Sequence, residues 1–182
     1  MRNSRRLVYV SGAPGSGKTS LAAPLAAKLG YALLTKDRIK ETLHDALGAP
    51  EPDLAWSRRL GAAAMELLWA LATDAPAVVI EANFRPYSDY ERARLSSLAA
   101  RPVEVFCACP ADLAMRRYSA RATHPVHVVT TLSREAMTEY DRPVGIGALI
   151  TVDTTVAVDV NAVAASVQAV MTAATATPLR TK

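Results

Sequence analysis

The stretch VSGAPGSGKTSLA, residues 10–22, decides the fold of this chain. It contains the pattern G-x-x-x-x-G-K-[ST], from Gly12 to Thr19, between an apolar run at residues 7–10 and a segment with helical periodicity. Glycines allow a tight loop whose backbone N–H groups surround phosphate oxygens, and the helix that follows turns its positive end toward the same anion. The stretch therefore predicts a nucleotide-phosphate site between a strand and a helix.

Two side chains of this loop have predicted roles of their own. Lys18 is expected to reach the terminal phosphates of the nucleotide, and Thr19 to offer its hydroxyl to Mg²⁺. A glycine turn that matches the pattern by chance is the alternative, and the correct flanks on both sides argue against it. The residues expected to contact the nucleotide here are Gly12, Ala13, Pro14, Gly15, Ser16, Gly17, Lys18, Thr19 and Ser20.

Length and composition indicate one globular domain over residues 1–182, with a net charge of +4 that is spread along the chain. No apolar run reaches the roughly 18 residues that a membrane-spanning helix needs. The apolar run at residues 7–10 follows a basic start, but it is shorter than the roughly 7 to 15 residues of a signal-peptide core. We therefore expect a cytoplasmic protein without a membrane segment; the sequence does not indicate its oligomeric state.

Strand-like apolar runs alternate with helix-like stretches along the chain. The expected strands are residues 7–10, 31–34, 77–80, 103–109 and 149–152. The expected helices are residues 18–29, 37–47, 54–72, 87–99, 111–121 and 160–171, with one short helix within 122–144 and a frayed tail at 173–182. This alternation is typical of right-handed βαβ units, so it predicts an α/β domain with a mainly parallel five-stranded sheet between two helical layers. Residues 111–145 are predicted to form a helical lid.

Polar residues follow the second expected strand, at the sheet edge that also carries the glycine loop. Asp37 is placed to orient or deprotonate an acceptor hydroxyl, because ligands of α/β proteins bind at the carboxyl ends of the strands. Its alternative role is to cap the next helix. Arg38 and Lys40 are either solvated helix charges or contacts to an anionic substrate, and we assign Lys40 to the substrate side.

Polar residues also follow the third expected strand. Glu81 ends a buried apolar run, where an acidic residue can hold Mg²⁺ through water, and Asn83 and Arg85 follow on the loop at the acceptor side. The alternative for Asn83 and Arg85 is ordinary loop polarity, since asparagine and proline favour turns.

The expected lid carries arginines and histidines. Arg117 and Arg121 lie one helical turn apart, so both can approach the same anion and supply cations over a transferred phosphate. The alternative is a basic, solvated helix face. His124 and His127 have no third metal ligand nearby and are interpreted as lid or substrate-loop residues.

These motifs together resemble a group of small P-loop kinases. The group includes chloramphenicol phosphotransferase, the kinase domain of polynucleotide kinase, the zeta toxins and many predicted kinases. The resemblance spans about residues 7–171, and its motifs are the glycine loop, TKD at 35–37, IEANF at 80–84, CPADLAMRRYSAR at 109–121 and ITVDTT at 150–155.

The resemblance implies a P-loop NTPase fold of three α/β/α layers, a sheet order of 2-3-1-4-5, and MgATP as phosphate donor. It implies that Asp37 is the general base and that Glu81 stands where the family usually has aspartate. The implied positions of the remaining residues are Asn83 near the acceptor, Arg117 and Arg121 in the lid, and Asp153 and Thr154 in the adenine-side loop.

The sequence therefore predicts a kinase that transfers the γ-phosphate of MgATP to a hydroxyl of a small molecule, such as an antibiotic, a sugar or a nucleoside. A polynucleotide 5′-hydroxyl kinase is the alternative within the same class, but aromatic residues are scarce and basic residues scattered. A zeta-toxin-like kinase would need a protein partner. A nucleotide switch or ATPase module is the alternative from another class, and no base-reading motif of a GTPase is present.

Overall fold

The five strands form one parallel sheet in the order β2-β3-β1-β4-β5, which confirms the predicted α/β class and strand order. The structure, a computed structural model, describes residues 5–48, 53–122, 124–129 and 131–176. The strands are β1 (Arg6–Ser11), β2 (Ala32–Thr35), β3 (Ala77–Glu81), β4 (Val103–Ala108) and β5 (Ala148–Asp153).

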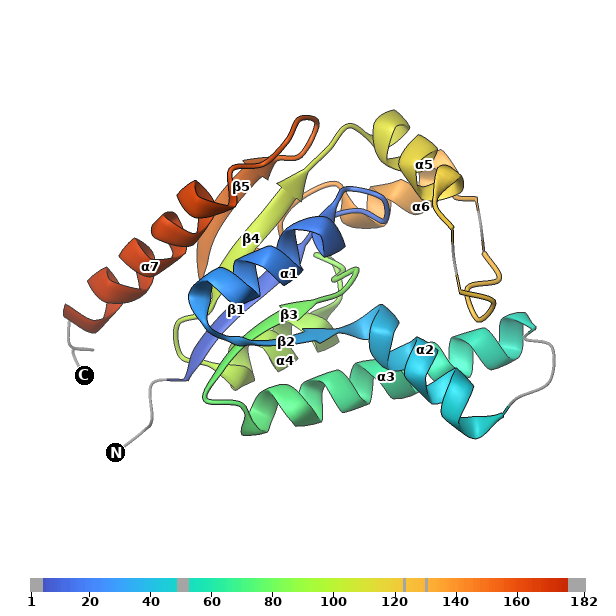
Figure 1. Ribbon diagram of the computed structural model, residues 1–182, viewed down its shortest axis with the longest axis horizontal. Helices are drawn as coiled ribbons and strands as arrows, with labels where there is room; N and C mark the ends of the chain where they lie inside the picture. Colours follow the sequence, from blue (N-terminus) through green and yellow to red (C-terminus); the bar gives the residue numbers. More distant parts are fainter. Residues whose placement is uncertain (1–4, 49–52, 123, 130, 177–182) are drawn as a thin grey trace.

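Helices cover both faces of this sheet (Figure 1). The helices are α1 (Lys18–Leu29), α2 (Lys36–Leu47), α3 (Leu54–Asp74), α4 (Asp89–Leu98), α5 (Ala111–Ala120), α6 (Arg134–Met137) and α7 (Val160–Ala176), with a 3-10 turn η1 (Thr138–Tyr140) after α6. α7 extends past the expected end at residue 171 because its last turns are rich in alanine, the strongest helix former. Residues 177–182 of the expected tail lie outside the described residues.

The alternation of side chains along β1 divides the core into two halves. Val8 and Val10 face α1 and α7, whereas Leu7 and Tyr9 face α3 and α4. All four side chains are completely buried, because both faces of a central parallel strand are covered. This double cover fixes the sheet, so the residues that follow its strands have defined positions.

Segment 111–145, the predicted lid, includes α5, α6 and η1. Its end is tied to the sheet by Glu104 of β4, a completely buried carboxylate that accepts hydrogen bonds from the backbone N–H groups of Val144 and Gly145, both at 2.8 Å. The same carboxylate accepts from the hydroxyls of Tyr9, at 2.9 Å, and Ser11, at 2.5 Å. None of the helices in the described part of the chain is both long enough and apolar enough to cross a membrane.

Candidate active site

The glycine loop joins β1 to α1 with backbone conformations that only glycine adopts easily. Gly12, Gly15 and Gly17 have φ angles of 130°, 80° and 90°. A Cβ atom on Gly15 would lie 2.1 Å from the carbonyl oxygen of Ala114 in α5, so the loop packs directly against the first helix of segment 111–145. The loop and that helix therefore form one wall of the site.

The polar side chains of Lys18 and Ser16, in and next to this loop, are buried. The Lys18 side chain is 4 % exposed, and its Nζ donates to the carbonyl oxygen of Ala13 at 2.7 Å. Burial lowers the pKa of Lys18, and the nearby Glu81 carboxylate opposes this shift. The buried Ser16 hydroxyl has no hydrogen-bond partner among the residues that the structure describes. A buried cation and an unpaired hydroxyl in a glycine loop fit a phosphate group, as the sequence predicts.

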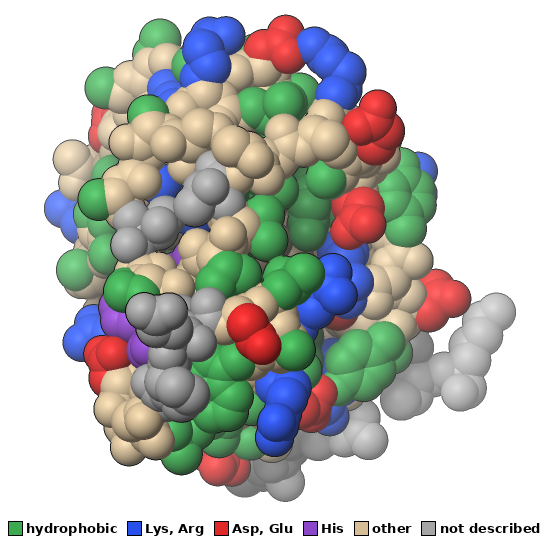
Figure 2. Space-filling model, turned by 90° about the vertical axis from the view of Figure 1, so that its right-hand side faces the viewer, with side chains coloured by type: hydrophobic (Ala, Val, Ile, Leu, Met, Phe, Trp, Pro, Cys, Tyr) green, Lys and Arg blue, Asp and Glu red, His purple; other side chains and the backbone are tan. Residues whose placement is uncertain are grey.

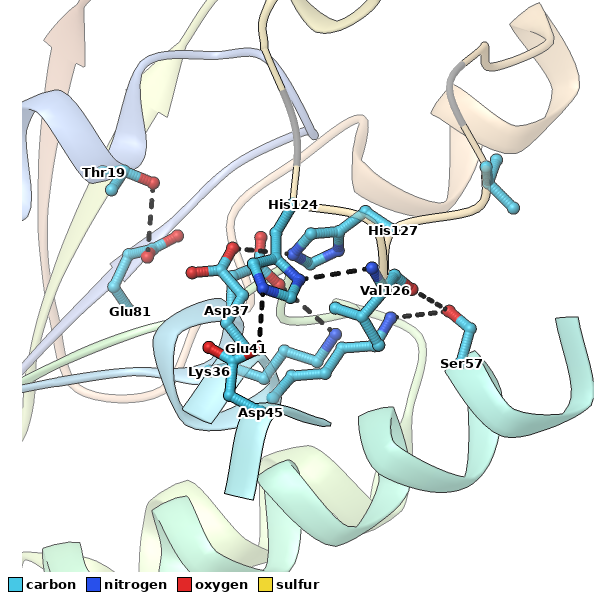
Figure 3. Close-up of polar contacts among 12 residues, drawn as sticks. Thr19, Lys36, Asp37, Glu41, Asp45, Ser57, Glu81, His124, Val126 and His127 are labelled. Carbon is cyan, nitrogen blue, oxygen red and sulfur yellow. Dashed lines mark hydrogen bonds and ion pairs between the residues drawn. The ribbon is translucent and has the colours of Figure 1, made fainter. Parts of the chain in front are cut away.

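Thr19 and Glu81 lie side by side at the start of α1 and the end of β3. Thr19 Oγ1 donates to Glu81 Oε2 at 3.4 Å (Figure 3). Burial raises the pKa of Glu81, with Lys18 acting in the opposite direction. A hydroxyl and a carboxylate are oxygen ligands of the kind that Mg²⁺ prefers, directly or through water, beside nucleotide phosphates. The pair fits the predicted metal position.

Asp37 lies in the first turn of α2, at the same sheet edge. The helix begins after Thr35, so Asp37 is not its N-cap residue, and Thr35 pairs in the sheet with Glu81. Lys36 Nζ lies 3.4 Å from Asp37 Oδ1. Burial alone would raise the pKa of Asp37, but the positive charges around it, first that of Lys36 and then those of Arg121 and Lys18, outweigh burial and hold the pKa below its usual value. The carboxylate is therefore ionised among cations.

The two expected lid arginines point to different parts of the site. Arg117 donates to the carbonyl oxygens of Thr154, at 2.8 Å, and Thr155, at 3.3 Å. Arg121 lies just beyond α5, with its guanidinium 4.4 Å from the centre of the Tyr118 ring. Of these two arginines, Arg121 is the one whose charge acts on the pKa values of both Lys18 and Asp37. The expected convergence on one anion is thus not present in this arrangement.

The loop after β5 is shaped by its own hydrogen bonds. Asp153 accepts from the backbone N–H and hydroxyl of Thr155, at 2.8 and 2.7 Å, and Thr154 is buried with its hydroxyl on the carbonyl oxygen of Ala108, at 3.0 Å. A cavity of about 710 Å³ lies beside it and borders the glycine loop at Ala13. The loop and the cavity lie at the carboxyl ends of β4 and β5, where the adenine side is expected.

Three residues assigned to the acceptor side differ in how firmly they are held. Lys40 is 5 % exposed and donates to the Ser57 hydroxyl at 2.7 Å; burial, helped by the charge of Lys36, lowers the pKa of Lys40 to about 8. Arg85 donates twice through its guanidinium to Glu91 Oε1, at 2.9 and 2.7 Å, and that carboxylate also accepts from the Arg85 backbone N–H. Asn83 is half-buried on the loop after β3. Lys40 and Arg85 thus have structural partners.

Sequence reasoning missed the acidic residues of α2 that meet segment 111–145. Glu41 and Asp45 contact His127 and His124 across 86 and 79 residues of chain. The signal that could have pointed to them is the spacing of Asp37, Glu41 and Asp45 at four-residue intervals, which places them on one helix face.

Comparison with known proteins agrees with this geometry. A family model described as "AAA domain" matches residues 7–143. A candidate kinase from Chloroflexus aurantiacus j-10-fl is 31 % identical with a TM-score of 0.78, and the match covers 91 % of this chain and 98 % of that one. No curated protein matches the chain.

Two more distant solved structures share the fold. Shikimate kinase from Acinetobacter baumannii, in complex with shikimate, is 17 % identical with a TM-score of 0.61, and the match covers 94 % of this chain and 96 % of that one. A gluconokinase from Sinorhizobium meliloti 1021 is 18 % identical with a TM-score of 0.56, and the match covers 95 % of each chain. The fold is thus that of P-loop kinases, whereas the likeness to chloramphenicol phosphotransferase, polynucleotide kinase and zeta toxins stays a resemblance.

Proposed function

The chain belongs to the family of AAA domains, and on that premise we propose that it is a kinase that transfers the γ-phosphate of MgATP to a hydroxyl of a small molecule. The observation that carries the proposal is the position of the Asp37 carboxylate, in the first turn of α2 and 3.4 Å from Lys36 Nζ, at the sheet edge that holds the glycine loop. A nucleotide-binding module needs the loop alone. A phosphotransferase also needs a group that orients or deprotonates its acceptor, and Asp37 is placed for that task.

The donor half of the site consists of the loop, Lys18, Thr19 and Glu81. The loop N–H groups and Lys18 would hold the phosphates, while Thr19 and Glu81 would hold Mg²⁺, Glu81 through water. MgATP supplies the phosphoryl group and the charge neutralisation that its transfer requires. The nucleotide base is expected toward Asp153, Thr154 and Arg117.

The acceptor half is organised by Asp37. The acceptor hydroxyl oxygen forms a bond to the γ-phosphorus as the bond from that phosphorus to the bridging oxygen of ADP breaks. The hydroxyl proton would pass to Asp37, and Arg121, whose charge acts on Asp37, would stabilise the charge of the transferred group. Asn83 and Arg85 are expected to border the acceptor.

A small acceptor fits the surroundings better than a polynucleotide end. On the face shown in Figure 2, Lys and Arg side chains drawn in colour alternate with Asp and Glu and form no continuous basic band. A protein that tracks a nucleic-acid backbone needs such a band. Two proteins of the same fold, shikimate kinase and gluconokinase, are named as kinases of small molecules.

The test is an acceptor screen with MgATP, in which phosphorylated product is detected by mass spectrometry. The panel holds antibiotics, sugars, nucleosides and oligonucleotides with a free 5′-hydroxyl. Lys18→Ala should abolish product formation, because the buried cation at the phosphates is lost. Lys28→Ala is the matched control, since Lys28 lies in the last turn of the same helix and is exposed. ATP hydrolysis at one slow rate whatever acceptor is added would indicate a nucleotide switch and refute the kinase proposal.

A further inference from the structure

A turn of segment 111–145, residues 124–127, is docked on α2 and α3. It brings His124 and His127 beside His44 of α2, so that all three histidines of the chain gather at one end of the molecule. Histidine atoms are visible toward the left of the face shown in Figure 2, partly beneath other residues. Figure 3 shows the contacts that hold the turn there.

The centre of the docked turn is Val126, whose side chain is completely buried. Its carbonyl oxygen accepts a hydrogen bond from Ser57 Oγ of α3 at 2.8 Å, and the same Ser57 oxygen accepts from Lys40 Nζ of α2 at 2.7 Å. The turn is therefore fixed to both helices through one buried chain of hydrogen bonds (Figure 3).

The two histidines of the turn pair with successive carboxylates on one face of α2. His127 Nε2 lies 2.9 Å from Glu41 Oε1, and His124 Nε2 lies 3.0 Å from Asp45 Oδ1. The His127 pair is the better shielded, with exposed side-chain fractions of 10 % and 35 %, against 25 % and 67 % for the His124 pair. Because exposed pairs contribute little, the His127–Glu41 contact is expected to contribute more to docking of the turn than the His124–Asp45 contact.

His127 also connects the turn to Asp37. Glu41 lies one helical turn after Asp37 on α2, and the negative charge of Asp37 acts on the His127 ring, where it opposes the effect of burial on the pKa of His127. A carboxylate only accepts hydrogen bonds, so the Nε2 atom of His127 carries the proton that reaches Glu41. The turn thus lies against the acceptor side of the site.

We propose that His127 is a positioning residue: by donating to Glu41 it holds the turn 124–127 against α2, where the turn forms a wall of the acceptor site beside Asp37. The expected effect of His127 on turnover rests on the proposed kinase function, whereas the role of His127 in docking the turn does not. An acceptor would then bind well only while the His127–Glu41 hydrogen bond is made.

The first measurement is hydrogen exchange of residues 122–133 in the full chain without ligands. His127→Ala should speed exchange of this turn about tenfold, as expected for loss of one hydrogen bond to a charged group, while α1 and the sheet stay unchanged. His127→Gln keeps an amide donor for Glu41 and should restore protection. His124→Ala is the matched control, because it removes the exposed pair, and its effect should stay below about fivefold.

The second measurement uses an acceptor identified by the screen above. His127→Ala should raise the KM for the acceptor about tenfold and leave the Kd for MgATP unchanged, and His127→Gln should restore the KM. Unchanged exchange in His127→Ala overturns the proposal. Faster exchange of the turn in His127→Ala with an unchanged KM for the acceptor also overturns the proposal, but does not contradict the kinase function. Failure of the wild-type chain to phosphorylate any acceptor refutes the kinase function, and the exchange result then decides the docking role by itself.

Discussion

At the scale of single residues, burial and neighbouring charge shift the two carboxylates of the site in opposite directions. Burial raises the pKa of Glu81, which has Lys18 as its main cationic neighbour. Asp37 is half-buried, but the positive charges around it, above all that of Lys36, hold its pKa below the usual value. Two carboxylates whose pKa values are pushed apart are suited to different tasks. Asp37 stays ionised and can receive a proton, whereas Glu81 gains most from a bound cation.

We expect Asp37→Asn to lower the rate of acceptor phosphorylation by roughly 10² to 10⁴-fold, the usual contribution of a general base. The Kd for MgATP should change little, because the nucleotide is held by the glycine loop and Lys18. Steady-state kinetics and calorimetric titration with nucleotide measure the two quantities separately. Asp74→Asn, at the exposed end of α3 before β3, is the control. Near wild-type turnover of Asp37→Asn would show that another group serves as the base.

At the scale of elements, Glu104 joins β1, β4 and the end of segment 111–145. Its buried carboxylate accepts four hydrogen bonds, two from hydroxyls of β1 and two from backbone N–H groups at residues 144 and 145. Hydrogen bonding to the carboxylate and burial in the core both raise the pKa of Tyr9, one of the donors, with burial the larger effect. Glu104 thus connects the end of segment 111–145 to β1, the strand that leads into the glycine loop.

Glu104→Ala should lower the free energy of unfolding by roughly 3 to 5 kcal/mol, because it leaves several buried donors unpaired and a cavity behind. Urea denaturation measures this loss. Glu104→Gln keeps the shape and part of the acceptor capacity and should cost less. Glu66→Ala removes a carboxylate paired with Arg94 at the surface and should cost at most about 1 kcal/mol. An equal loss in Glu104→Ala and Glu66→Ala would contradict the anchoring role of Glu104.

The elements themselves were largely predictable, because the relevant signals are local. Apolar runs marked the strands, and the glycine loop marked the junction of β1 and α1. The partners of Arg117 and His127 were not predictable, since each lies 37 or more residues away in the chain and the pairing depends on the packed fold. For the same reason the hydrogen bond from Lys40 to Ser57 was not predictable, and the assignment of Lys40 to the substrate side stays a prediction.

At the scale of the whole molecule, the turn 124–127 connects segment 111–145 to α2 and α3. We expect the docking of this turn to depend on pH. Burial lowers the pKa of His127 while the turn is docked, and Lys40 of α2 acts in the same direction. Asp37 and Glu41, which also face the ring from α2, act in the opposite direction and are outweighed. The ring next to it in the turn, His124, pairs with Asp45 farther along the helix. Docking therefore favours neutral His127.

Acidification should consequently release the turn. An undocked His127 regains its ordinary pKa of about 6.5, so docking is fully favoured above that pH and is lost as the pH falls through the lowered pKa of the docked state. Hydrogen exchange of residues 122–133, corrected for the intrinsic rate, should become faster between about pH 7.5 and about pH 5.5. His127→Gln carries no titrating group at this position and should remove the dependence. Stronger protection at the lower pH would mean that a charged His127–Glu41 ion pair holds the turn, and the assignment of neutral His127 would then be wrong.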